Sequence, residues 1–149
     1  MDQKHKIILL IAFIVALAAS FFLIYARNQK NYVIINNVKI FVKTANTSQK
    51  QIKGLSGQKN LAENQGLLFV YPDYGLRNFW MKGMLFPIDI IWILDDRVIG
   101  FEKNVPASNK EPLPIYKSPA SINYVLEVSS GFIDRHGIKI GDMVKFNLL

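Results

Sequence analysis

A run of 19 residues without a charge, Ile7–Tyr25, divides this chain of 149 residues into two parts of different chemistry. An α-helix rises 1.5 Å per residue, so a run of this length nearly crosses the roughly 30 Å hydrocarbon core of a bilayer. Basic residues flank it at both ends, Lys4 and Lys6 before it and Arg27 and Lys30 after it. The run predicts a transmembrane anchor in residues 1–27, with the lipid bilayer as the partner of residues 7–25.

The same segment has a second interpretation, a cleavable signal peptide. Its basic start and the small residues Ala16-Leu17-Ala18 fit a cleavage site, after which the domain would be secreted. The apolar stretch Phe21–Tyr25 continues well past that site, which favours an uncleaved anchor. Lys4 and Lys6 favour an amino terminus on the cytoplasmic side, so we expect the remaining chain on the extracytoplasmic side of the membrane.

The charge and composition of the rest of the chain argue against several kinds of partner. Residues 28–149 contain 15 lysines and arginines against 10 aspartates and glutamates, a net charge of +5 without a basic cluster, so we expect no nucleic-acid partner. The chain has no cysteine, and His136 is its only histidine outside the amino-terminal tail. We therefore expect no metal site and no cofactor.

After a short polar linker at residues 28–31, residues 32–149 read as a single globular domain. Residues 32–35 and 38–43 flank Asn36-Asn37, as the two strands of a β-hairpin flank its turn. Within the second segment Lys39, Phe41 and Lys43 alternate with Val38, Ile40 and Val42, which predicts one buried face. Further short strands are expected at 67–71 (ending before Pro72), 78–81, 88–94, 97–101 and 124–128, and residues 139–146 predict a turn into a last strand. The pattern predicts a mainly β or α+β fold, a compact curled sheet or small β-barrel-like domain.

Two short helices and one long loop complete this outline. Residues 47–55 predict a helix capped by Asn46 or Thr47, and residues 132–135 predict a second one capped by Ser129 or Ser130. Residues 104–121 contain four of the six prolines, so we expect a long loop that covers a site or spans one edge.

The segment Phe79–Trp92 places Lys82 and Asp89 in surroundings that are otherwise apolar. Because a buried charge costs several kcal/mol unless it is paired, we expect Asp89 to be buried and bonded to Lys82 or to backbone amides of the bend between them, with Glu127 as a third member. These charges either fix the strand register or belong to a polar pocket walled by Trp80, Trp92 and Tyr124. Both interpretations stay open.

Five blocks of sequence resemble, in the same order, the family called domain of unknown function 192, or uncharacterised protein family 0127. The blocks are residues 54–57 with 66–70, 79–82 with 87–91, 104–106, 124–127 and 137–142. One departure is Gly83-Met84, where the family commonly shows Asn-Thr; Asn and Gly both tolerate left-handed backbone angles. The resemblance implies a bacterial or archaeal protein behind a signal or anchor segment, and it carries no established reaction.

These observations predict a membrane-anchored, extracytoplasmic β domain that is a binding or accessory module of the cell envelope, with a small ligand or an envelope protein as its partner. The candidate ligand-binding residues are Trp80, Lys82, Asp89, Trp92 and Glu127. The alternative is a hydrolase or lyase that uses Asp89 and Glu127 for acid–base chemistry in a pocket beneath the proline-rich loop.

Overall fold

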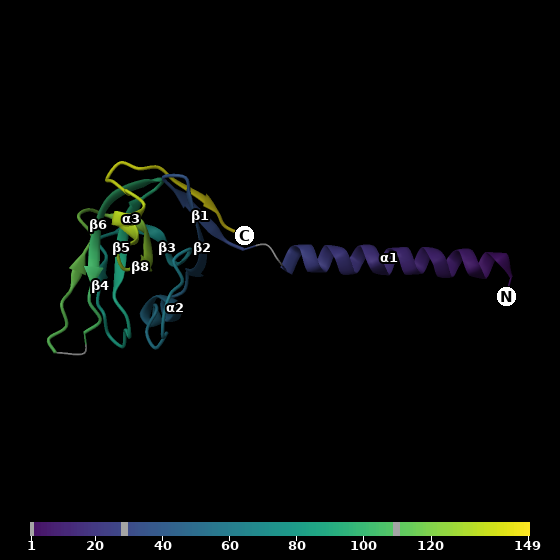
Figure 1. The fold of residues 1–149 in the computed structure, drawn as a ribbon, viewed down its shortest axis with the longest axis horizontal. Coiled ribbons are helices and arrows are strands. Elements are labelled where there is room, and N and C mark those ends of the chain that lie inside the picture. The colour runs from purple at the N-terminus through teal and green to yellow at the C-terminus, as the bar shows by residue number, and fades with distance from the viewer. Residues whose placement is uncertain (1, 28–29, 109–110) are drawn as a thin grey trace. The chain divides into compact units, whose positions relative to one another are not determined.

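A computed structural model of the protein describes residues 2–27, 30–108 and 111–149. The chain forms two compact units, one from the amino terminus to Lys30 and one over Asn31–Leu148. The first contains a single continuous helix, α1 (Gln3–Arg27), as the apolar run predicts (Figure 1). Its stretch Gln3–Phe22 is long and apolar enough to cross a membrane. The expected linker at 28–31 is described only in part, since residues 28 and 29 lie outside the described residues.

The second unit is built mainly of β-strands, as predicted (Figure 1). Its helices are α2 (Ser48–Lys53) and α3 (Phe132–Arg135). Its strands in the described residues are β1 (Tyr32–Ile35), β2 (Val38–Ala45), β3 (Gln65–Gly75), β4 (Asn78–Phe79), β5 (Ile88–Leu94), β6 (Arg97–Val105), β7 (Tyr116–Lys117), β8 (Ile122–Ser129) and β9 (Val144–Asn147).

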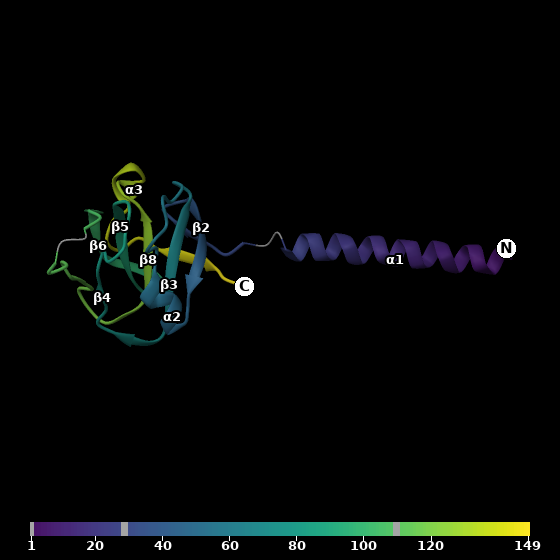
Figure 2. The same cartoon turned by 90° about the horizontal axis from the view of Figure 1, so that it is seen from below.

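Seven of these strands form one curled sheet in the order β6-β5-β8-β3-β2-β1-β9 (Figure 2). Only β2 and β3 pair in parallel within it. Its two ends approach each other, because Val98 N donates to Asp142 O at 3.0 Å and Val144 N donates to Asp96 O at 2.8 Å. The sheet is therefore a half barrel whose edges meet near the β5–β6 turn.

The sheet buries side chains on both faces. The inner cluster draws on strands from both ends of the sheet, including Val33, Ile91, Val98 and Val144, so it fills the inside of the curl. The outer cluster, with Phe69, Phe79, Trp92 and Val125 among its members, lies on the other face. Strand β5 is covered on both sides, and every residue from Ile88 to Ile93 is buried.

Several local expectations are confirmed, and others are wrong. The β1–β2 hairpin turns at Asn36 and Asn37, which have φ angles of 50° and 65°, as a type I′ turn requires. Strand β3 does not end before Pro72 but runs to Gly75, because its register with β8 shifts after Val70 and leaves the proline outside the ladder. The N-cap residue of helix α3 is Gly131, which forms no side-chain cap, so neither expected serine caps this helix.

The region between residues 76 and 121 also differs from the expectation. Strand β4 covers only Asn78–Phe79 and does not reach Met81, because the chain turns at residues 82–83. The proline-rich stretch is not all loop, since β7 pairs with β4 as a separate two-stranded sheet.

Candidate functional site: a cavity with a buried glutamate

Asp89 is fully buried on the inner face of the sheet, which confirms its predicted burial. Its Oδ1 accepts from Asn104 N at 2.8 Å and Gly131 N at 3.1 Å, and its Oδ2 accepts from Ile133 N at 2.9 Å. These donors lie at the end of β6 and at the start of α3. The expected partners, Lys82 or amides of the 82–88 bend, are therefore wrong, and the carboxylate joins the β6 end to α3.

Glu127 lies on the opposite face of the same sheet. Along β8 the side chains of Leu126 and Val128 belong to the inner cluster, whereas that of Val125 belongs to the outer one. Strand alternation therefore places Glu127 on the outer face. There it lines a cavity of about 200 Å³ between α2, β3, β4 and the chain around Lys82.

The burial of the Glu127 carboxyl group leaves one of its two oxygens without a hydrogen-bond partner among the described residues. The residue is 5% exposed, and this oxygen is its buried Oε2 atom. Removal from water disfavours the charged form, and burial raises the pKa of Glu127 to about 8. At neutral pH this glutamate is mainly protonated.

The cavity lining combines aromatic, small polar and basic residues. Aromatic side chains come from β3 and from β4 with the residue after it, and lysines come from the end of α2 and from the turn at residue 82. The full lining is Ser48, Gln51, Ile52, Lys53, Gly54, Leu55, Ser56, Phe69, Tyr71, Asn78, Phe79, Trp80, Lys82, Met84 and Glu127. Glu127 is thus the only acidic residue of the lining, alongside two basic ones.

Tyr71 brings a second titratable group into the wall. Burial raises the pKa of Tyr71 to about 12; the nearby Arg77 acts in the opposite direction, and Glu127 adds a further increase. The Arg77 guanidinium lies 3.9 Å from the centroid of the Tyr71 ring and donates to Asp73 Oδ1 at 3.2 Å. Tyr71 is therefore a neutral hydrogen-bonding group at physiological pH.

Two glycines shape the part of the cavity formed by α2 and the turn. Gly54 ends α2 with a φ angle of 50°, and a Cβ there would lie 3.6 Å from Phe69 Cζ and 4.0 Å from Glu127 Oε2. Gly83 has a φ angle of 68°, and its carbonyl accepts from Gly57 N at 2.9 Å. The first glycine leaves the space beside the carboxyl group open, and the second ties the turn to the end of the α2 segment.

The structure brings together three of the five predicted ligand-binding residues, Trp80, Lys82 and Glu127. Trp92 lies behind them in the outer core, where its ring meets Phe79 edge-on at 5.5 Å. Asp89 is on the other face of the sheet. The acid–base pair of Asp89 and Glu127 suggested by the alternative interpretation is therefore not assembled.

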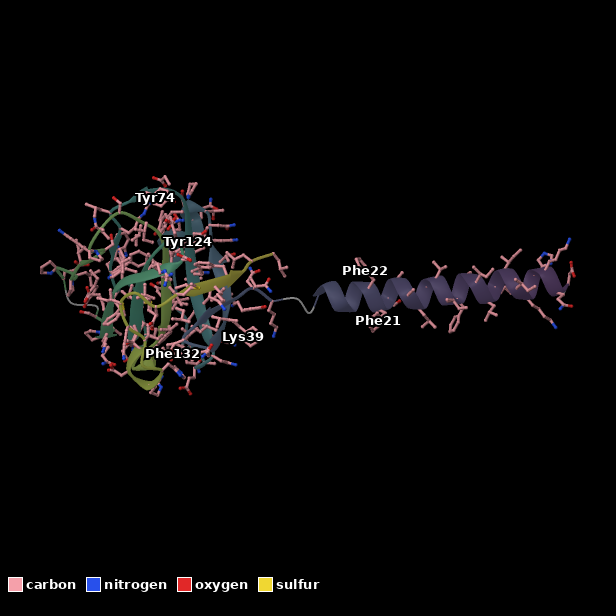
Figure 3. All side chains as sticks on the ribbon, turned by 90° about the horizontal axis from the view of Figure 1, so that it is seen from above. Phe21, Phe22, Lys39, Tyr74, Tyr124 and Phe132 are labelled. Carbon is pink, nitrogen blue, oxygen red and sulfur yellow. The ribbon has the colours of Figure 1, made fainter. Side chains whose placement is uncertain are left out.

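Tyr124 was also expected in the pocket wall, and this expectation is wrong. It packs on the inner side of the sheet, 4.6 Å from Phe146 between ring centroids (Figure 3). Its position on β8 differs from that of Glu127 by an odd number of residues, so the two side chains point to opposite faces.

Sequence reasoning missed most of the wall, including Gln51, Ser56, Phe69, Tyr71 and Phe79. One indication was available, because Phe69 and Tyr71 share a face of a strand that was predicted in part. The sequence does not predict that α2 lines the cavity, since the position of this helix depends on how the residues between β2 and β3 fold. The side chain of Gln51 illustrates this, because its Nε2 donates to Ala45 O at 3.3 Å and to Val70 O at 3.1 Å.

The fold and the cavity define a small curled β domain with a buried acid, Glu127, whose Oε2 has no hydrogen-bond partner in the described part of the chain. The protein belongs to the DUF192 family, described as "Uncharacterized ACR", which it matches over residues 32–146. No curated protein matches it.

Two solved structures share this fold. A protein of Sinorhizobium meliloti described as a candidate transcription regulator is 25% identical, with a TM-score of 0.71 over 79% of this chain and 94% of that chain. A protein of unknown function from Novosphingobium aromaticivorans is 28% identical, with a TM-score of 0.70 over 76% of this chain and 83% of that chain.

Proposed function

We propose that this protein is a membrane-anchored, extracytoplasmic module of the cell envelope that binds a small molecule in the Glu127 cavity. The observation that carries the proposal is the buried Glu127 carboxyl, whose Oε2 has no partner among the described residues while the side chain lines an open space. Buried polar groups are nearly always hydrogen-bonded, and a strongly perturbed acid in a cavity is a mark of a functional site.

A structural role accounts poorly for this glutamate. An apolar residue of similar size would fill the outer core without the cost of a desolvated carboxyl group, which is about 1–3 kcal/mol for an unsatisfied polar atom. Asp89 shows what a structural carboxylate looks like in this protein, with three backbone donors around it. A ligand that bonds to Glu127 explains why an acid occupies this position.

The membrane part of the proposal is supported by the length and the flanking charges of α1. Its side chains from Ile7 to Phe22 are exposed and mostly apolar, a surface that suits lipid (Figure 3). The description of the Sinorhizobium protein as a transcription regulator suggests DNA as a partner. The evenly spread charge of residues 28–149 offers no basic cluster for that role.

The test is a screen of small compounds by ligand-observed NMR on the full chain in detergent micelles. We expect compounds that bind wild-type protein and lose binding in Glu127→Gln. Glu102→Gln is the matched control, because it is the same substitution at a residue of β6 that lies outside the cavity lining. Compounds that bind Glu127→Gln as well as the wild type, or an absence of any binding compound, would contradict the proposal.

A further inference from the structure

We infer, building on the proposed binding function, that the cavity takes a small zwitterion of amino-acid size whose ammonium group bonds to Glu127 and whose anionic group meets Lys53 and Lys82. Each half of this assignment rests on a different part of the lining. The acid and the aromatic side chains select the cation, and the two lysines select the anion.

The acidic part of the site is the Glu127 carboxyl group. Glu127 is buried and lines the cavity, and its Oε2 lacks a partner among the residues that the structure describes, so a donor from the ligand would satisfy the carboxyl group. An ammonium group supplies such donors and a positive charge, which converts the protonated carboxyl group to a carboxylate and releases its proton to solvent. A charged pair of this kind forms stronger hydrogen bonds than a neutral one.

The walls next to Glu127 also suit a cation. Phe69, Tyr71, Phe79 and Trp80 all line the cavity, and the rings of Phe69 and Phe79 meet edge-on at 4.8 Å. Aromatic faces attract ammonium groups through the ring quadrupole, more strongly where water is excluded. Four aromatic residues in the same lining as one buried carboxyl group form the basis of an amine site.

The basic half of the site lies toward solvent. Lys53 ends α2 and Lys82 lies in the turn that follows β4; both are exposed and both line the cavity. Neither of them forms an ion pair with any described residue. By contrast, Arg77, which lies over Tyr71, is engaged by Asp73. The two lysines are therefore available for an anionic group of the ligand.

A ligand with one charged group fits this lining less well than a ligand with two groups of opposite charge. A ligand with only an ammonium group would approach Glu127 past two lysines, and a ligand with only a carboxylate would leave Glu127 unsatisfied. A zwitterion satisfies both ends. The volume of about 200 Å³ lies below the roughly 300–1,000 Å³ of drug-sized sites. This size fits a free amino acid.

The experiment uses the full chain in micelles and follows binding by calorimetry and by the fluorescence of Trp80, which lines the cavity. The probes are the twenty common L-amino acids, with ethylamine and propionate as the amine-only and acid-only counterparts of alanine, and the corresponding counterparts of any amino acid that binds. We expect at least one amino acid to bind, with its two counterparts at least tenfold weaker. Glu127→Gln and Lys82→Gln should each weaken that binding at least tenfold, whereas Lys117→Gln, on β7, should not.

A second readout separates an ion pair from general polar contact. The measurement is made at pH 6.5, where Glu127, whose pKa burial raises to about 8, is protonated before the ligand binds. The other titratable groups of the lining are Tyr71, Lys53 and Lys82, and Arg77 lies over the Tyr71 ring. Calorimetry in buffers of different ionisation enthalpy should show about one proton released for each ligand bound. Binding without proton release, or equal binding of a counterpart, would overturn the zwitterion. If no amino acid binds but another compound of the NMR screen does, this inference fails while the proposed function stands.

Discussion

Asp89 and Glu127 are two buried carboxyl groups from one sheet with opposite environments. Asp89 accepts three backbone hydrogen bonds, which fix the end of β6 against the start of α3. Glu127 lies on the other face, and its Oε2 has no partner among the described residues. The first arrangement stabilises the fold because it satisfies amides that would otherwise be buried unpaired. The second leaves a polar group available at a cavity.

Replacing Asp89 with Ala should destabilise the domain by roughly 2–4 kcal/mol, because three backbone donors lose their acceptor. Urea unfolding followed by tryptophan fluorescence measures the change. Asp96→Ala is the control, since the Asp96 carboxylate is exposed and lies 3.7 Å from Arg97 Nε, while its backbone bond to Val144 is kept in the variant. This substitution should change stability by less than about 0.5 kcal/mol. Equal stability of the two variants would show that the bonds to Asp89 contribute little.

The burial of Asp89 could be predicted from its apolar neighbours along the strand. Its partners could not, because Asn104, Gly131 and Ile133 are 15 to 44 residues away in sequence. For Glu127 the alternation of β8 fixes the face of the sheet once the strand is known. Which face holds a cavity depends on how the segment 76–87 and α2 fold over it, and this is long-range information.

The turn after β4 and the end of α2 are joined by Gly83. Its carbonyl accepts from Gly57 N, its φ angle is 68°, and an added Cβ would clash with Ser56 Oγ. The predicted left-handed angle at Gly83 is confirmed. Because Lys82 lies in this turn and Ser56 follows α2, the contact between the two segments positions both sides of the cavity.

Gly83→Val should cost roughly 1–3 kcal/mol, since a β-branched residue rarely adopts a positive φ angle. Gly83→Asn should be milder, because Asn tolerates the angle, and the remaining clash should ease in a Ser56→Ala background. Thermal unfolding of the wild type, Gly83→Val, Gly83→Asn and the double variant Gly83→Asn/Ser56→Ala tests this. If Val and Asn are tolerated equally, the backbone angle is not what requires glycine.

Among the secondary-structure elements, those with clear local patterns were predictable. The β1–β2 hairpin follows from the two asparagines between apolar segments and from the alternation along β2, and β5 follows from an apolar run bounded by Pro87 and Asp95. The continuation of β3 through Pro72 was not predictable from the sequence, because it depends on an irregular register with β8. The pairing of β4 with β7 was not predictable either, since it joins segments almost 40 residues apart in the sequence.

The whole chain combines a helix suited to a bilayer with a β domain that contains the cavity. Our proposal puts this domain on the extracytoplasmic side of the membrane, because lysines precede the helix. The absence of cysteine from the sequence makes this testable, because a single introduced cysteine is a unique label.

We expect Lys145→Cys, on the exposed side of β9, to react with a membrane-impermeant maleimide in intact cells. Lys4→Cys, at the start of α1, should react only after the membrane is opened. The reverse pattern would place the domain in the cytoplasm. Labelling of Lys145→Cys in the culture medium instead of on cells would indicate cleavage and secretion.

The most direct test of the Glu127 site is the unfolding free energy of wild type and Glu127→Gln, measured in urea from pH 4.5 to 9. The pKa of Glu127 is raised in the folded protein from 4.5 to about 8, so between these values the unfolded chain releases a proton that the folded protein keeps. Wild-type stability from this group is full below pH 4.5 and falls by up to about 1.4 kcal/mol per pH unit until pH 8.

Glu127→Gln has no such loss, and its amide is close in shape to the protonated acid. We predict that the two proteins differ by less than about 1 kcal/mol at pH 4.5 and that the variant is more stable by roughly 3–5 kcal/mol above pH 8. A variant that is less stable than wild type at every pH would mean that the carboxyl group holds the fold, and it would contradict the assignment of Glu127 to a ligand site.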